Sequence, residues 1–263
     1  MSSLFDFSSR IAFVSGTSRG LGERFALTLA KAGADVVLTS RTLASLDDVR
    51  RRVEDMGRKC LPLELDVRSL DSIVAAVQAA KRHFGKLDIL VCNAGCNVRK
   101  PSVDVTWDDW NLILDTNLRG SFFLAQQAAK ELMIPARYGR IILIGSVTCV
   151  AGYAGLAPYG ASRGGVKQMA MSLADDWGVH GITVNVLAPG WFKTAQNAVM
   201  YESAEWVEYL SDRIPLKRPG AMDDLDGPLL FLTSEESRYV TAQTLLVDGG
   251  ISGGATRALP KKK

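Results

Sequence analysis

The sequence has few of the residues that build a metal centre or a disulfide framework. It contains four cysteines and two histidines among 263 residues. The cysteines, Cys60, Cys92, Cys96 and Cys149, form no close CxxC pair, so we expect neither a zinc site nor any other metal site. Free thiols are typical of a reducing cytosol, and we therefore expect a cytoplasmic protein.

Long apolar runs and a strong charge of one sign are also missing. No run approaches the ~20 residues that cross a bilayer. Met1 to Ser9 has neither the basic nor the apolar region of a secretory signal. The net charge is +3 and the two signs are interspersed, which does not favour a nucleic-acid partner. The sequence thus predicts a protein that binds no membrane and no nucleic acid.

Short apolar runs alternate with longer helical patterns along the whole chain. The runs that we expect to be strands are 10–15, 35–39, 60–65, 87–92, 140–144, 182–187 and 244–247. The helical patterns between them cover 20–32, 43–56, 70–84, 107–114, 118–136 and 158–178. Continuous Val, Ile and Leu strands separated by helices indicate a parallel sheet covered on both faces. We predict an α/β fold, a single doubly wound Rossmann domain with a parallel seven-stranded sheet.

No linker, repeat or low-complexity segment divides the chain. We therefore assign residues 1–250 to one domain that binds a cofactor and carries the chemistry, and 251–263 to a C-terminal tail. The least regular stretch, 190–220, is rich in aromatic residues. Loops that follow strand ends usually shape the substrate site, so we predict a substrate lid there. A helix pair at an oligomer interface is the alternative interpretation.

A glycine-rich turn separates the first expected strand from the first helix. Gly16, Gly20 and Gly22 allow a tight turn, a close backbone approach to a pyrophosphate and close packing of helix on strand. The start of the helix adds free N–H groups and the positive end of its dipole. This position in an alternating pattern predicts a dinucleotide site. The other members of the candidate turn are Ser18, Arg19 and Leu21.

The end of the second strand indicates which dinucleotide is bound. A site for NAD usually places Asp or Glu there to bind the ribose hydroxyls, whereas this chain has Thr39, Ser40 and Arg41. No carboxylate would repel a 2′-phosphate, and guanidinium groups suit phosphate through paired donors and permanent charge. Arg41, with Arg19 close by in the turn, therefore favours NADP over NAD. The alternative interpretation is that either arginine is only a solvated surface residue.

Several further motifs occur in a fixed order. They are Asp66-Val67, Asn93-Ala94-Gly95 after the fourth strand, Asn117 in TNLRGSFF, Ser146 after the fifth strand, Tyr159 in a YxxxR string, Pro189-Gly190 after the sixth strand and Val247 to Gly250, which reads VDGG. With the turn at Ser15 to Gly22, they resemble the short-chain dehydrogenase/reductase family over nearly the whole chain. The resemblance is nearest to the ketoacyl-carrier-protein-reductase or gluconate-dehydrogenase type.

The resemblance implies a set of site residues. Cofactor contacts would come from Asp66, Val67, Asn93, Ala94, Gly95, Tyr159, Arg163, Pro189 and Gly190. Tyr159 would be the acid/base, Ser146 would donate to the substrate oxygen, and Asn117 would hold a water on the proton path. The implied activity is NADP-dependent reduction of a small-molecule ketone, or oxidation of a secondary alcohol. The family also implies a homotetramer or homodimer.

Arg163 departs from the family pattern, which has lysine four residues after the tyrosine. A tyrosine keeps its proton up to about pH 10 unless a fixed cation stabilises the phenolate. Arg163 keeps the cation on the same helical face, but it is a poor proton relay. Three interpretations of Arg163 follow. It is either a tolerated substitute in a working reductase, or an introduced substitution that weakens activity, or a sign that the site catalyses a non-redox reaction such as isomerisation or cyclisation. The sequence leaves these three interpretations open.

The substrate would lie beside the nicotinamide end of this site. Its expected pocket walls are Asn97, Thr148, Tyr153, Trp191 and Phe192. The aromatic members of this set are equally suited to a core or an interface. Cys96 and Cys149 are interpreted as small packing residues near the pocket, because neither has an adjacent histidine to activate its thiol.

Overall fold

A computed structural model describes residues 5–194 and 198–253. It contains a parallel sheet whose strands run in the order β3-β2-β1-β4-β5-β6-β7, which confirms the predicted seven-stranded doubly wound fold. The strands are β1 Ile11–Val14, β2 Asp35–Ser40, β3 Cys60–Glu64, β4 Ile89–Cys92, β5 Gly139–Ile144, β6 Ile182–Pro189 and β7 Thr244–Val247. Most of the predicted tail, from residue 254 on, lies outside the described residues.

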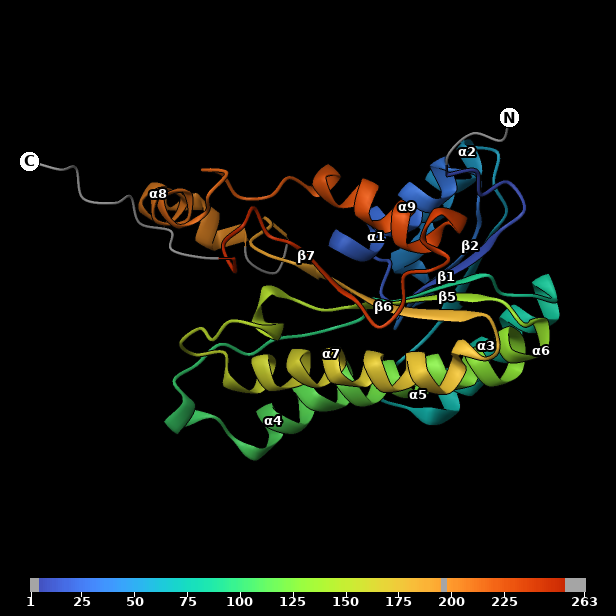
Figure 1. Cartoon of the computed structure of the whole chain (residues 1–263), viewed down its shortest axis with the longest axis horizontal. Coiled ribbons are helices and arrows are strands. Elements are labelled where there is room, and N and C mark those ends of the chain that lie inside the picture. The colour runs from blue at the N-terminus through green and yellow to red at the C-terminus, as the bar shows by residue number, and fades with distance from the viewer. Residues whose placement is uncertain (1–4, 195–197, 254–263) are drawn as a thin grey trace, which may run out of the picture.

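Helices cover both faces of the sheet (Figure 1). Their bounds are α1 Gly20–Lys31, α2 Asp47–Asp55, α3 Leu70–Phe84, α4 Trp107–Leu114, α5 Gly120–Ala128, α6 Ile134–Ala136, α7 Ala157–Gly178, α8 Ala204–Arg213 and α9 Asp226–Thr233. Helices α1, α2 and α9 lie on one face, and α3, α5 and α7 lie on the other. No helix in the described part of the chain is long and apolar enough to cross a membrane.

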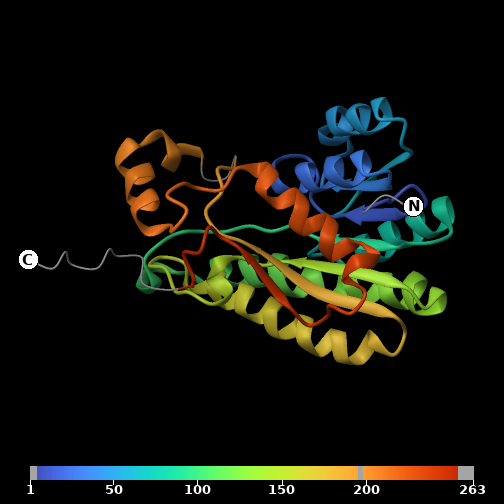
Figure 2. The same cartoon turned by 45° about the horizontal axis from the view of Figure 1, so that its top comes forward.

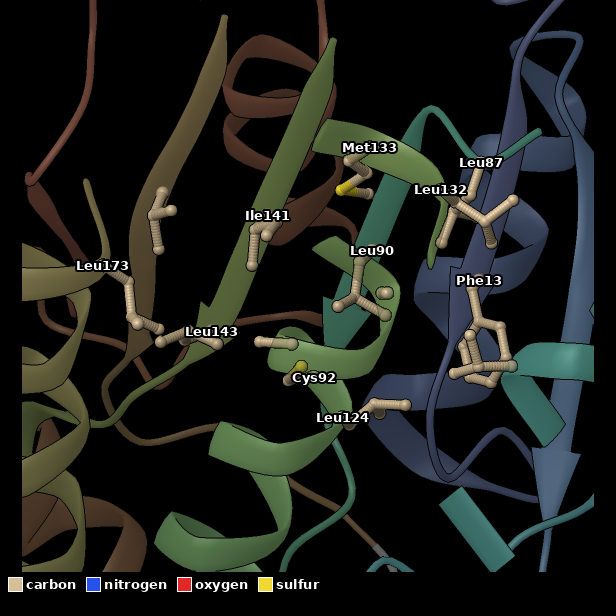
Figure 3. Close-up of a cluster of buried hydrophobic side chains, with 14 of the residues drawn as sticks. Phe13, Leu87, Leu90, Cys92, Leu124, Leu132, Met133, Ile141, Leu143 and Leu173 are labelled. Atoms are coloured by element: carbon tan, nitrogen blue, oxygen red, sulfur yellow. The ribbon is translucent and has the colours of Figure 1, made fainter. Parts of the chain in front are cut away.

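Two hydrophobic clusters hold these layers together. Side chains alternate across a strand, so in β1 Ile11 and Phe13 pack toward the α3, α5 and α7 layer, while Ala12 and Val14 pack toward α1, α2 and α9. Figure 3 shows the first cluster, where Phe13 lies with Leu90 and Leu124. Because helices cover both faces, the central strands β1 and β4 are continuous, fully buried apolar runs.

Some helical boundaries differ from the prediction. The segment expected to be helical over 43–56 begins with a 3-10 turn at Leu43–Leu46 before α2. The segment expected over 118–136 contains two π-helical turns, Asp115–Arg119 and Ala129–Met133, on either side of α5. In both places the chain keeps turning in the same direction, and only the hydrogen-bonding step changes.

The segment 190–220 leaves the sheet after β6 and contains a 3-10 turn, Ala198–Glu202, and α8. Figure 2 shows α8 standing apart from the helices that cover the sheet. Residues 195–197 of the predicted lid lie outside the described residues. The segment therefore begins at the carboxyl end of β6, and its role as a lid stays a prediction.

Candidate active site

The site lies where the strand order reverses. Strand β1 is paired with β2 on one side and β4 on the other, so the chain switches direction across the sheet between β1 and β4. In doubly wound sheets, ligands bind outside the carboxyl ends of the strands at such a switch point. Here a cavity of 410 Å³ is lined by segments that follow β1, β2, β3, β4, β5 and β6.

The glycine-rich turn has the backbone geometry that its sequence predicts. Gly16 and Gly20 adopt positive φ values of 72° and 65°, which cost a residue with a side chain more than they cost glycine. Gly22 lies inside α1, where a Cβ atom would overlap the carbonyl oxygen of Gly16 and the side-chain amide of Asn93. The turn therefore packs against its own helix so closely that only glycine fits at residue 22.

Side chains from neighbouring strands fix this turn. The Asn93 amide donates to the carbonyl oxygens of Ser15, at 2.9 Å, and Gly16, at 3.2 Å. The Ser15 hydroxyl in return accepts the N–H groups of Asn93 and Ala94, both at 2.9 Å. On the other side, the Thr39 hydroxyl donates to the Val14 carbonyl. Asn93 thus holds the backbone beside the cavity rather than presenting its amide to a reacting group.

Two arginines at the far end of the cavity carry charge that the protein does not neutralise. Arg19 and Arg41 line the cavity and are exposed, and neither forms an ion pair with a residue that the structure describes. Asp66 and Val67 line the same end. The Asp66 carboxylate is paired with Arg68, and this hydrogen bonding holds the Asp66 pKa below its ordinary value.

Ser146 and Tyr159 lie at the opposite end of the same cavity. Ser146 follows β5 and caps the short turn Val147–Cys149, where its hydroxyl accepts the Thr148 N–H at 3.2 Å. Tyr159 lies in the first turn of α7, with Arg163 one turn later. Two hydroxyl groups from different elements thus face one space, as general acid catalysis on a substrate oxygen requires.

Arg163 is a buried cation beside this pair. It is 5% exposed, and its guanidinium centre lies 5.0 Å from the centre of the Tyr159 ring. Its Nη1 donates to the Ile144 carbonyl at 2.7 Å, and its Nε has no hydrogen-bond partner among the described residues. A Cβ atom on Gly95 would lie 2.6 Å from Nη2, so the missing side chain at Gly95 makes room for the guanidinium. The cation is therefore fixed in place and not paired with a described carboxylate.

Asn117 lies behind this cavity instead of lining it. It is fully buried in the π-helical turn between α4 and α5. Its amide donates to the Cys96 carbonyl at 2.9 Å and to the Ser162 hydroxyl at 3.1 Å, and its oxygen accepts the Cys96 N–H at 2.8 Å. Both donor hydrogens of the amide are used within the protein. The predicted role of this side chain in holding a water stays a prediction.

The expected pocket walls are divided between two places. Phe192 lines the cavity, whereas Asn97, Thr148, Tyr153 and Trp191 do not line it. Tyr153 and Trp191 instead begin a run of edge-to-face and stacked rings. This run joins Tyr153, Trp191, Trp206 and Tyr209, with centroids 5.3 to 5.5 Å apart. The run connects the loop after β6 to α8 and, through Tyr153, to the loop that precedes α7.

The other residues predicted from sequence for the cofactor site lie on the cavity. Besides those described above, the lining includes Ser18, Leu21, Ala94, Gly95, Pro189 and Gly190. Cys96, expected as a small packing residue near the pocket, also lines the cavity. The lining residues not predicted from sequence are Ser40, Leu65, Arg68, Leu112, Thr116, Ile144, Gly145 and Thr194. Most of these directly follow a strand or neighbour a predicted residue, so their position at the carboxyl edge was a usable signal. Burial raises the pKa of the Cys149 thiol, which opposes a nucleophilic role for it.

Known proteins share this architecture and sequence. Residues 16–252 match a family model described as enoyl-(acyl carrier protein) reductase. Gluconate 5-dehydrogenase of Gluconobacter oxydans is 39% identical, covering 95% of this chain and 97% of that protein. The 3-oxoacyl-[acyl-carrier-protein] reductase of Escherichia coli is 35% identical, with 94% and 98% coverage. The crystal structure of a gluconate 5-dehydrogenase from Burkholderia cenocepacia in complex with NADP and tartrate is 36% identical, with a TM-score of 0.92 and coverage of 96% and 98%.

Proposed function

The chain belongs to the short-chain dehydrogenase/reductase family, and we propose that it is an NADP(H)-dependent oxidoreductase that interconverts a ketone and a secondary alcohol. One observation carries the proposal. A single cavity joins the glycine-rich turn and two arginines at one end to Ser146 and Tyr159 at the other. The related gluconate 5-dehydrogenase of known structure contains NADP, which supports the same cofactor here.

The residues present fit NADP. The N-terminus of α1 and the turn beneath it offer backbone N–H groups and a positive dipole to the pyrophosphate. Arg19 and Arg41, which form no ion pair with a described residue, would hold the 2′-phosphate. Arg163 lines the other end of the cavity and places a positive charge there. The bound nicotinamide would supply or accept the hydride.

The proton chemistry then rests on this chain's own side chains. During reduction the carbonyl oxygen gains a proton, which we assign to the Tyr159 hydroxyl. The Ser146 hydroxyl donates a hydrogen bond to the same oxygen and stabilises its developing charge. Arg163, fixed on the Ile144 carbonyl, supplies a permanent positive charge beside the tyrosine ring. Because a guanidinium does not release its proton, Arg163 acts as a fixed charge and not as a relay.

We assign the substrate to small ketones and secondary alcohols, and propose sugar acids of the gluconate type as the first candidates. Related proteins are named for gluconate and for 2-dehydro-3-deoxy-D-gluconate, and others for oxoacyl chains. Phe192 lies on the cavity, and Tyr153 and Trp191 form the beginning of the ring run nearby. We place the substrate between these residues and the Ser146–Tyr159 pair, and we propose a homotetramer or homodimer from the family resemblance.

The test is the substitution Tyr159→Phe. We expect it to abolish turnover in a panel of ketones and alcohols, followed by nicotinamide absorbance, while NADPH binding followed by fluorescence is retained. Tyr239→Phe is the matched control, because Tyr239 is 100% exposed and lies outside the cavity. If Tyr159→Phe keeps its turnover, the assignment of Tyr159 as the acid/base is wrong.

Arg163 keeps a second candidate function open, namely a non-redox reaction such as isomerisation or cyclisation that uses the same cofactor cavity. The specific observation is the cation at Arg163, which cannot pass a proton as a lysine does. The discriminating experiment measures NADPH oxidation by the native protein and by Arg163→Lys. Turnover in both supports the reductase. Turnover only in Arg163→Lys supports an inactivated or repurposed site, and comparison with the genomic sequence then separates these two.

A further inference from the structure

Arg68 lies on the cavity, but nothing in the family pattern assigns it a role. It belongs to the loop between β3 and α3 and follows Asp66 and Val67, two of the predicted cofactor contacts. Its Nε and Nη2 donate to the two oxygens of Asp66, at 3.2 and 2.9 Å. The Asp66 carboxylate also accepts the Arg68 backbone N–H at 2.9 Å. One edge of the guanidinium is thus clamped by a carboxylate two residues away.

This pairing distinguishes Arg68 from the other two arginines of the cavity. Arg19 and Arg41 form no ion pair with a described residue, so no carboxylate contact has to be broken for either to bind a phosphate. The charge of Arg68 is offset by Asp66, and phosphate binding would have to compete with an existing two-point contact. Arg68 is therefore poorly suited to phosphate, even though it lines the same end of the cavity.

A clamped guanidinium still offers its flat face. Carboxylates bind guanidinium through its edge, and aromatic rings stack on its plane, so the two contacts are compatible. The Arg68 side chain is 43% exposed, which leaves surface for a second contact. Three apolar side chains line this part of the cavity as well, namely Leu65, Val67 and Leu112. A planar, largely apolar heterocycle suits such surroundings better than an anion does.

We propose that Arg68 stacks on the adenine ring of the bound dinucleotide, with its plane fixed by Asp66. The proposal rests on the proposed NADP(H) binding. The proposal gives the arginines at this end of the cavity two different roles in binding. Arg19 and Arg41 discriminate NADP from NAD through the 2′-phosphate, whereas Arg68 contributes equally to both because both carry adenine.

The test measures dissociation constants of NADP+ and NAD+ by titration calorimetry for the native protein and for Arg68→Ala. We expect Arg68→Ala to weaken both ligands by the same factor, roughly tenfold, as alanine replacements of base-stacking groups do. Arg41→Ala should instead weaken NADP+ much more than NAD+. Arg51→Ala is the matched surface control, because Arg51 pairs with Asp48 on α2 and lies outside the cavity.

A second variant separates stacking from charge. Arg68→Lys keeps the charge but removes the guanidinium plane, so we expect it to bind both ligands as weakly as Arg68→Ala. Full rescue by lysine, a loss confined to NADP+, or unchanged affinity in Arg68→Ala would each overturn the stacking proposal. A lowered melting temperature that accounts for the affinity loss, measured without ligand, would overturn it as well. If the native protein binds neither dinucleotide, the proposed function itself fails, and this outcome is distinct from the others.

Discussion

The substitution Gly22→Ala tests how closely the glycine-rich turn packs against α1. A methyl group at residue 22 would overlap the carbonyl oxygen of Gly16 and would lie 2.8 Å from its carbonyl carbon. Two carbon atoms in contact prefer a separation of about 3.5–4.0 Å. The turn would therefore have to move by roughly 1 Å. Because the obstacle is backbone and not the end of a flexible side chain, this movement displaces the phosphate-binding N–H groups themselves.

Two opposing effects set the expected change in stability. Alanine in a helix is favoured over glycine by about 1 kcal/mol. Overpacking costs about 1–3 kcal/mol, and contact with backbone places this site at the upper end. We expect a net loss of about 2 kcal/mol, or a melting temperature lower by roughly 4–8 °C. Loss of one charge-assisted hydrogen bond to the pyrophosphate should also raise the Kd for NADP+ by about tenfold or more.

Gly227→Ala is the matched control for this experiment. Gly227 also lies in the first turn of a helix, α9, but a Cβ atom there meets nothing within 4 Å. We expect Gly227→Ala to leave NADP+ binding unchanged and to stabilise the protein by up to about 1 kcal/mol. Thermal unfolding and calorimetric titration of both variants provide the measurements. If Gly22→Ala melts and binds like the native protein, the close packing of turn on helix is wrong.

Three further predictions concern groups around the sheet. Asn117→Ala should lower the free energy of unfolding by about 2–4 kcal/mol, because it removes the side chain that pairs with both the N–H and the carbonyl oxygen of Cys96, and denaturant unfolding measures this. Burial raises the pKa of Tyr138, which contacts Glu235. The contribution of the neutral Tyr138 side chain to stability is therefore complete below about pH 10 and is lost at higher pH. Tyr138→Phe should flatten this alkaline loss of stability in unfolding experiments. Hydrogen bonds from Lys100 and Thr106 lower the pKa of Asp109 to about 2. The contribution of the Asp109 carboxylate to stability is therefore present above about pH 4 and is lost as the pH falls through 2. Asp109→Asn should remove that part of the acid unfolding transition.

The sheet was predictable because burial on both faces leaves a simple pattern. The central strands β1 and β4 are continuous, fully buried apolar runs, and the helices between strands return the chain so that each new strand pairs in parallel. The π-helical turns beside α5 were not predictable, since the residues in Asp115–Arg119 and Ala129–Met133 are compatible with ordinary helix. In the first of these turns, the Asn117 side chain bonds to Cys96 and Ser162 on distant elements. Such contacts join residues 21 and 45 positions apart in the chain.

The candidate site divides along the same line. Its cofactor end was predictable from glycines, because positive φ values and the close approach at Gly22 leave no choice of residue. Arg68 was missed because its plane is defined by a contact with Asp66 that only the folded loop reveals. Tyr153 and Trp191 were expected on the pocket wall, yet they form a run of rings beside it. Aromatic residues report burial well but say little about which surface buries them.

The contacts of Arg163 show how the cavity accommodates an arginine beside Tyr159. The guanidinium occupies the space that a side chain at residue 95 would fill, and it is anchored on the Ile144 carbonyl at the end of β5. These contacts accommodate an arginine without displacing Tyr159 from the cavity. They favour the interpretation of Arg163 as a tolerated, fixed cation beside Tyr159 over its interpretation as an inactivating substitution. Under the proposed mechanism, a guanidinium at residue 163 cannot relay a proton, so the proposed acid/base Tyr159 would have to regain its proton by another route. The proposed cofactor contacts, which come from the glycine-rich turn and from arginines at the other end of the cavity, do not need that route, whereas the proposed turnover does.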